Sequence, residues 1–285
     1  MNQRFRSRQK SSVWNPNAGQ AAGLVLLAVF TLASGVAHAH DLWLIPGESA
    51  AAGKPTTIEA NSGMDFPMSE HAPDPAAFAR RIVFDPDGQE ATLTAAGTER
   101  KSGLLRFVPT KPGKHIVAVE TQPKLITLDA NKFNEYLVAD GLPHIYRLRA
   151  KEKSLDQPGR ERYSKSPKAI VQVGDGGAGD PSRVLGLTLE IVPLADPFQL
   201  KVGDTLRVRV HFRGEPLADA NLGWDHPGDG EPPTGTTRTD AKGESLVPIA
   251  RTGLMTVRLT HMTRPRTDEY EWESFWTTLT FRIPE

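Results

Sequence analysis

The chain has 285 residues, with 34 basic and 34 acidic side chains and no cysteine. This balanced charge excludes the basic footprint that nucleic-acid binding requires. Without cysteine there is no disulfide and no thiolate ligand, so a metal site must use imidazole, carboxylate, amine or thioether groups.

Residues 1–39 have the three parts of a secretory signal peptide. Four basic and no acidic residues lie in the first ten positions, an apolar run follows from Gly23 to Val36, and Ala37-His38-Ala39 supplies small residues for cleavage. The apolar run is shorter than the roughly 20 residues of a membrane-spanning helix. We therefore expect cleavage after Ala39, export to the periplasm, and a mature chain that does not span the membrane.

Residues 40–121 have the pattern of antiparallel strands. Short alternating stretches are bounded by Gly, Pro, Asp and Asn, and the clearest are "TTIEA", "RIVFD", "GLLRFVP" and "KHIVAVET". This texture predicts an N-terminal β-sandwich module.

The middle segment, residues 122–186, is predicted to be a linker or insertion. Asp129 is a plausible N-cap, Phe133 and Leu137 follow at helical spacing, and Gly141 stands where a helix would stop. One short helix is therefore expected. The chain from Lys151 to Pro167 is charged and is expected to be irregular, followed by a strand at residues 169–173 and the loop "GDGGAGDP".

Residues 187–285 again predict strands. From Thr205 to Arg213, apolar residues alternate with Arg and His, so one face meets a core and the other meets water. Similar patterns occur in "TGLMTVRLTH" and at residues 275–281. The prediction is an immunoglobulin-like or transthyretin-like sandwich, and the fold class is all-β, with two β-sandwich modules.

Some apparent motifs are better explained by ordinary structure. Gly174, Gly176 and Gly179 fit G-x-G-x-x-G, but a strand follows them and not the helix that a dinucleotide site needs. The loop "WDHPGDGEPP" has ordinary turn residues and no recognised ligand spacing. His115 and His144 stand among apolar neighbours, where a core or capping role is the default.

His40 differs because cleavage changes its chemistry. A cut after Ala39 makes it the mature N-terminus, where its amine and imidazole can chelate one metal ion. A cut after Ala37 instead gives His38-Ala39-His40, which suits square-planar Ni(II) or Cu(II). His71 follows Met64 and Met68 in a predicted loop, and it, His144 and His261 are candidates for further ligands.

In order along the mature chain, several segments resemble the NikM-type periplasmic components of nickel and cobalt ABC uptake systems, secreted bacterial proteins classed as a domain of unknown function. The segments are "AHAHDLWLIP", "ERYSKSPKAIVQVG", "LGLTLEIVPLADPFQL", "GEPLADANL", "TDAKGE" and "EWESFWTTLTF". The resemblance implies two β-rich modules, divalent-metal handling, and a membrane permease as partner. It places the family's "HDLWL" start on His40, Asp41 and Trp43. Unlike the NikM-type proteins, which are tied to membrane helices, this chain has no such helix after its signal.

We therefore expect a soluble periplasmic protein that binds a divalent transition metal, nickel or cobalt with copper as an alternative, through His40 and further histidines. It is expected to serve metal uptake and not to be an enzyme. One alternative is a metal-free periplasmic interaction module, and another is a copper oxidase with an N-terminal histidine brace. Conventional hydrolase chemistry has no support, because G-x-S-x-G and H-E-x-x-H are absent.

Overall fold

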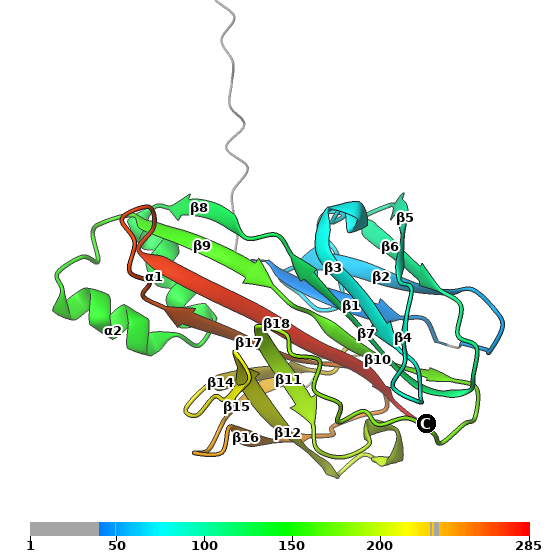
Figure 1. The fold of residues 1–285 in the computed structure, drawn as a ribbon. Helices are drawn as coiled ribbons and strands as arrows, with labels where there is room; N and C mark the ends of the chain where they lie inside the picture. The colour runs from blue at the N-terminus through cyan, green and yellow to red at the C-terminus, as the bar shows by residue number, and fades with distance from the viewer. Residues whose placement is uncertain (1–39, 49, 229, 231–233) are drawn as a thin grey trace, which may run out of the picture. The chain divides into compact units, whose positions relative to one another are not determined.

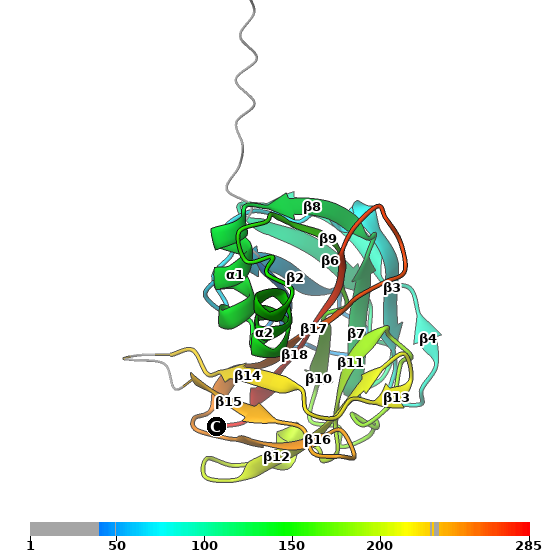
Figure 2. The ribbon, with the colours of Figure 1, turned by 90° about the vertical axis from the view of Figure 1, so that its left-hand side faces the viewer.

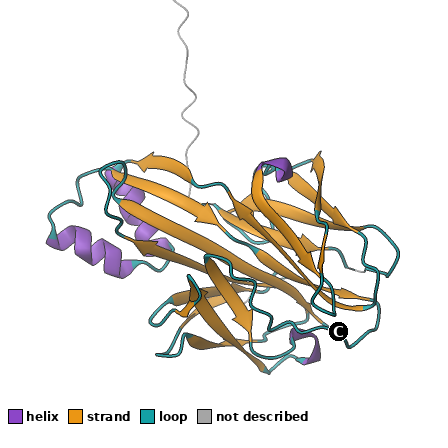
Figure 3. Cartoon of the chain, viewed as in Figure 1, coloured by secondary structure: helices purple, strands orange, loops and turns teal. Residues whose placement is uncertain are grey.

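Strands are the main regular structure of the computed structural model, which describes residues 40–48, 50–228, 230 and 234–285 (Figures 1 and 3). The predicted export signal, residues 1–39, and part of the 224–233 loop lie outside the described residues. The all-β prediction is confirmed: the strands form three sheets with mostly antiparallel pairing. None of the helices in the described part of the chain is long and apolar enough to span a membrane.

A ten-stranded sheet runs through the described chain. Its path is β15 (Thr234–Arg238), β14 (Asn221–Asp225), β17 (Gly253–Thr263), β18 (Trp272–Ile283), β10 (Lys168–Val173), β7 (Gly113–Thr121), β3 (Phe78–Phe84) and β4 (Glu90–Ala91), with β9 (Gly159–Lys165) and β8 (Lys124–Leu128) beside it. Strand β18 pairs with β17 along one edge and, in parallel, with β9 and β10 along the other. Strands of the predicted N-terminal and C-terminal modules therefore share one sheet, while the division at residues 40–121, 122–186 and 187–285 stays a prediction.

Two smaller sheets pack on this central sheet. One is β1 (Asp41–Pro46), β2 (Thr56–Gly63), β6 (Ser102–Phe107) and β5 (Thr94–Glu99). The other is β11 (Leu189–Pro193), β12 (Thr205–Phe212), β13 (Glu215–Pro216) and β16 (Glu244–Pro248). Each encloses its own buried apolar cluster, so both predicted sandwich cores are present.

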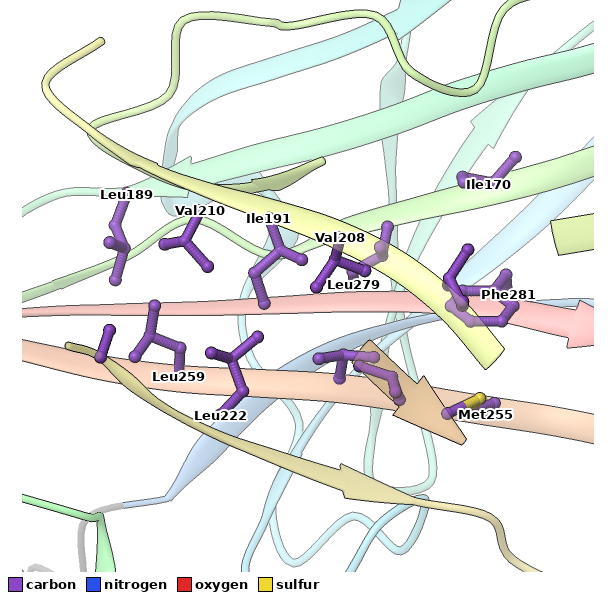
Figure 4. Packing of buried hydrophobic residues seen from close by; sticks show 14 of the residues in the cluster. Ile170, Leu189, Ile191, Val208, Val210, Leu222, Met255, Leu259, Leu279 and Phe281 are labelled. Carbon is purple, nitrogen blue, oxygen red and sulfur yellow. The ribbon is translucent and has the colours of Figure 1, made fainter. Parts of the chain in front are cut away.

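The two cores lie on opposite faces of the central sheet. In β10, Ala169, Val171 and Val173 pack in the cluster beneath β1 and β2, whereas Ile170 packs in the cluster beneath β11 and β12. Successive side chains of a strand point to opposite faces, which explains this division. Figure 4 shows the second cluster, where β11 and β12 meet β17 and β18.

The middle segment contains two helices, one more than the sequence predicted. The expected helix is α1 (Ala130–Ala139), and it stops two residues before Gly141, whose φ of 72° is the left-handed conformation that favours glycine. The second, α2 (Pro143–Lys151), lies beside α1 (Figure 2). Its charged sequence does not predict a helix, because tertiary contacts stabilise it. The buried Arg149 side chain donates hydrogen bonds to Asn134 of α1 and to the carbonyls of Ser154 and Gln157.

The expectation of irregular structure from Lys151 to Pro167 was wrong in part. Its second half forms β9, which lies between β8 and β18 despite the charged sequence GRERYSK. Two neighbouring strands supply its backbone hydrogen bonds, so pairing overrides the absence of an apolar alternation. The remaining elements of the described chain are two short 3₁₀ turns, Pro75–Ala77 and Pro197–Gln199.

A buried ion pair fastens one loop to the central sheet. Lys168 of β10 and Glu190 of β11 lie 2.8 Å apart, and each side chain is 1% exposed. The Glu190 carboxylate also accepts hydrogen bonds from the backbone N–H groups of residues 185–187. A carboxylate with this many donors tolerates burial only while its partners remain in place.

Replacing Lys168 by Met should lower the free energy of unfolding by about 3–5 kcal/mol, because the Glu190 charge is left buried without its partner. Urea unfolding measures the change. The matched control is Lys111→Met, which removes an ion pair with Asp87 whose side chains are 50% and 57% exposed. That control should cost less than about 1 kcal/mol, and equal losses in the two variants would contradict the assignment.

Candidate metal centre

The first described residue, His40, lies beside His71. Asp41 at the start of β1 pairs with Gly63 at the end of β2, and an antiparallel bridge between Ser62 and His71 returns the following loop along β2. The two imidazole rings meet edge to face, with centroids 4.6 Å apart. Two of the four predicted ligands are therefore neighbours.

Glu70 orients the ring of His40. Its Oε2 lies 2.8 Å from His40 Nε2, and its Oε1 accepts the backbone N–H of Met64 at 3.0 Å. The hydrogen bond from His40 lowers the pKa of the Glu70 carboxyl, which is therefore ionised at neutral pH and acts only as an acceptor. In the neutral ring the hydrogen then lies on Nε2 of His40, and Nδ1 is the nitrogen with ligand character.

His71 is neutral near neutral pH. Partial burial, followed by the positive potential of His40, lowers the pKa of its imidazole below the usual value. A neutral imidazole is the form that binds metal ions. His71 therefore presents a nitrogen donor of the required protonation state.

The other two predicted ligands, His144 and His261, lie elsewhere. His261 of β17 is the register partner of Phe275, and its ring packs on Phe212 at 4.5 Å. Directly paired residues share a face, and Phe275 belongs to the cluster beneath β11 and β12. The central sheet thus separates His261 from His40, which precedes β1 on the other face. Burial lowers the pKa of His261 to about 4, as expected for a packed core histidine.

His144 is associated with His261 and not with His40. It lies at the start of α2, where burial and the nearby cations Arg147 and Arg238 lower the pKa of its imidazole. The charge of His144 in turn contributes to the lowered pKa of His261. The structure therefore brings His71 to His40 and leaves the other two histidines in a separate region.

A cavity of about 410 Å³ opens beside the two histidines. His40 and His71 line it together with Leu42, Phe78 and the side chains of β8 and β9 that include Lys124, Tyr163 and Lys165. A ligand bound to the two imidazoles would therefore face open volume. Such a site leaves coordination positions accessible for exchange.

Lys165 holds the backbone of His40 by a hydrogen bond. Its Nζ donates a hydrogen bond to the His40 carbonyl and lies 5.6 Å and 5.3 Å from the ring centroids of Tyr163 and Trp276. Burial lowers the pKa of this ammonium to about 8, while nearby carboxylates, chiefly Asp41 and Asp140, oppose the shift. Neither Lys165 nor Glu70 was predicted from the sequence, because neither lies in a metal-ligand or catalytic motif.

The carboxylate of Asp41 turns away from the histidines into a buried charged group. Arg258 lies 3.5 Å from Asp41 and 3.3 Å from Asp225. Burial raises the pKa of Asp41 and raises that of neighbouring Asp140 to about 8. This group anchors the start of β1 by charge, and it offers no donors to the histidine pair.

No group of three or more His, Asp or Glu side chains within the described residues is arranged to hold a metal ion. A metal ion held by the two imidazoles would take its further donors from groups of another kind. The α-amine that cleavage would create on His40 is such a donor, because it belongs to the same residue as Nδ1.

Comparisons with known proteins place the chain in a family. Residues 37–263 match the model of a domain of unknown function, DUF4198. The chain belongs to the DUF4198 family. A search of curated proteins finds no match to it.

Two solved structures resemble this DUF4198 protein. One is a tetra-tandem repeat in the extending region of a large adhesion protein, with a TM-score of 0.22, 12% identity, and coverage of 86% of this chain and 50% of the other. The second is a marsupial T cell receptor, with a TM-score of 0.20, 10% identity, and coverage of 84% and 73%. The DUF4198 chain spans half the length of the adhesion-protein structure.

Behind the site of the DUF4198 protein, Glu161 of β9 lies in a buried hydrogen-bond network. Its carboxyl group receives the hydroxyls of Ser274 and of Tyr136, and Trp276 Nε1 donates to Ser274 at 3.0 Å. Burial raises the pKa of Glu161 from 4.5 to about 7. The protonated form therefore contributes stability that is complete below pH 4.5 and is lost as the pH rises to 7.

Glu161→Gln should remove this pH dependence, because glutamine keeps the acceptor oxygen and cannot ionise. Between about pH 4.5 and 7.5 the free energy of unfolding of the native protein should fall by about 3 kcal/mol relative to the variant. Urea titrations across this range give the difference. The control is Glu135→Gln, at an exposed position of α1, whose free energy of unfolding should vary with pH as that of the native protein does. The same pH dependence in Glu161→Gln and the native protein would mean that Glu161 is ionised throughout this range, which would contradict the assignment.

Proposed function

We propose that the mature protein binds one divalent transition metal ion through the α-amine and imidazole of His40 and the imidazole of His71. The observation that carries this proposal is the pairing of the two rings at 4.6 Å, with Glu70 hydrogen-bonded to Nε2 of His40. Nickel, cobalt and copper are the candidate ions, since all three accept nitrogen ligands.

The donor set fits these ions better than hard cations. Two imidazoles and an amine are nitrogen donors, whereas calcium and magnesium require mostly oxygen ligands. The amine and Nδ1 of His40 belong to one residue, so they chelate without ordering a further segment of chain. Copper and nickel, which accept tetragonal nitrogen ligation, are favoured among the three.

We further propose that the protein works in the periplasm as a binding component of metal uptake, with a membrane permease as its partner, and not as an enzyme. The segments that resemble NikM-type proteins support this role, and the cavity beside the histidines gives a bound ion access for exchange.

The terminal amine can be tested by comparing the mature protein, which begins at His40, with a form extended by Gly-Ser-Gly-Ser before His40. The extension converts the amine to an amide and places the new terminal amine four residues from His40, so the affinity for Cu(II) and Ni(II) should fall at least about tenfold. Competition titrations against a chromophoric chelator measure the affinities. His71→Ala should give a similar loss and His144→Ala none, whereas equal affinities in mature and extended forms would exclude the terminal chelate.

The orienting role of Glu70 has a separate test. Glu70→Gln removes the ionised acceptor that holds His40 Nε2, and loss of such a partner costs about 10–100-fold in metal affinity. The matched control is Glu59→Gln, at the exposed position of β2, where the carboxylate accepts the Ser102 hydroxyl. Isothermal titration with Ni(II) should show weakened binding for the first variant alone, and an unchanged affinity would assign Glu70 a purely structural role.

A further inference from the structure

The methionines of the described chain divide into two kinds. Met255 and Met262 are 0% and 3% exposed and pack in apolar clusters. Met64 and Met68 are 48% and 68% exposed, and both lie in the segment that joins β2 to Glu70 and His71. Both exposed methionines therefore lie in the segment that leads to His71.

The backbone of this segment is held in place. Met68 N–H bonds the Asp65 carbonyl at 2.7 Å, and Asn61 donates to the Pro67 carbonyl at 3.2 Å. The N–H of Met64 bonds the same Glu70 carboxylate that orients His40. The two methionines thus belong to a fixed turn that is tied directly to the proposed site.

Exposure of these side chains gains nothing for folding. Apolar side chains are stabilised by burial, and the two core methionines show that this fold buries methionine elsewhere. The chemistry that distinguishes methionine from other apolar residues is its soft, polarisable sulfur. Thioethers are soft ligands that suit Cu(I), whereas imidazole and amine nitrogens suit Cu(II) and Ni(II).

We propose that Met64 and Met68 form a Cu(I) site next to the histidine pair, so that copper is the ion this protein handles. The inference rests on the proposed function, in which the histidines take the divalent ion. The two sets of donors then receive copper in either oxidation state, the nitrogens Cu(II) and the sulfurs Cu(I). Each site binds the ion supplied to it, and no electron transfer between them is required.

The test compares the mature protein with the double variant Met64→Leu and Met68→Leu. Leucine keeps the apolar surface and removes the sulfur, so the double variant tests the sulfur atoms as metal ligands. Anaerobic competition with a chromophoric Cu(I) chelator should show a loss of affinity of about tenfold or more, since even an outer-shell partner of a metal ligand is worth about tenfold. Cu(II) affinity should be unchanged.

Met262→Leu, in the core, is the matched control and should leave Cu(I) affinity unchanged. Cu(I) affinity equal to that of the native protein in the double variant overturns the thioether site. Loss of Cu(I) affinity in the double variant, together with failure of the mature protein to bind Cu(II) or Ni(II), supports the thioether site while removing the proposed histidine site. The two proposals therefore fail independently.

Discussion

The pairing of β18 is the constraint on which the rest of the fold depends. This strand joins β17 along one edge and pairs in parallel with β9 and β10 along the other, so segments from across the described chain meet on it. Its odd-numbered apolar residues face the core beneath β11 and β12, while the Thr278 hydroxyl bonds the Leu42 carbonyl of β1 on the opposite face. The position of β1, and hence of His40, follows from that contact.

The strands that alternate in sequence were predictable, because one buried face imposes a period of two. Leu206, Val208 and Val210 are all fully buried, as their pattern indicated. Strand β9 and helix α2 were not predictable, since their charged side chains are accommodated by partners distant in sequence, such as Arg149 by the 154–157 turn. A local sequence pattern predicts which face of an element is buried, but it does not predict which distant residues pair with that element.

The candidate site shows the same limit. His40 was identified from the chemistry of cleavage and His71 only as one of several candidates, because no spacing rule joins residues on the two sides of a β-hairpin. Glu70 and Lys165 escaped notice, although each holds His40 by a direct hydrogen bond. These supporting residues are defined by the register of β1 with β2 and of β9 with β18, which is a property of the folded chain.

His40 lies directly before β1, and no group of three His, Asp or Glu side chains among the described residues could hold a metal ion there. This has a consequence for when the proposed metal is acquired. In the proposed function, the last donor appears only when the signal peptidase cuts. The precursor in the cytoplasm therefore lacks the complete donor set and does not compete for ions there. Which metal ion binds then depends on the ions that are present in the compartment where the signal is cleaved. The site therefore does not need to select one metal ion from the others by affinity alone.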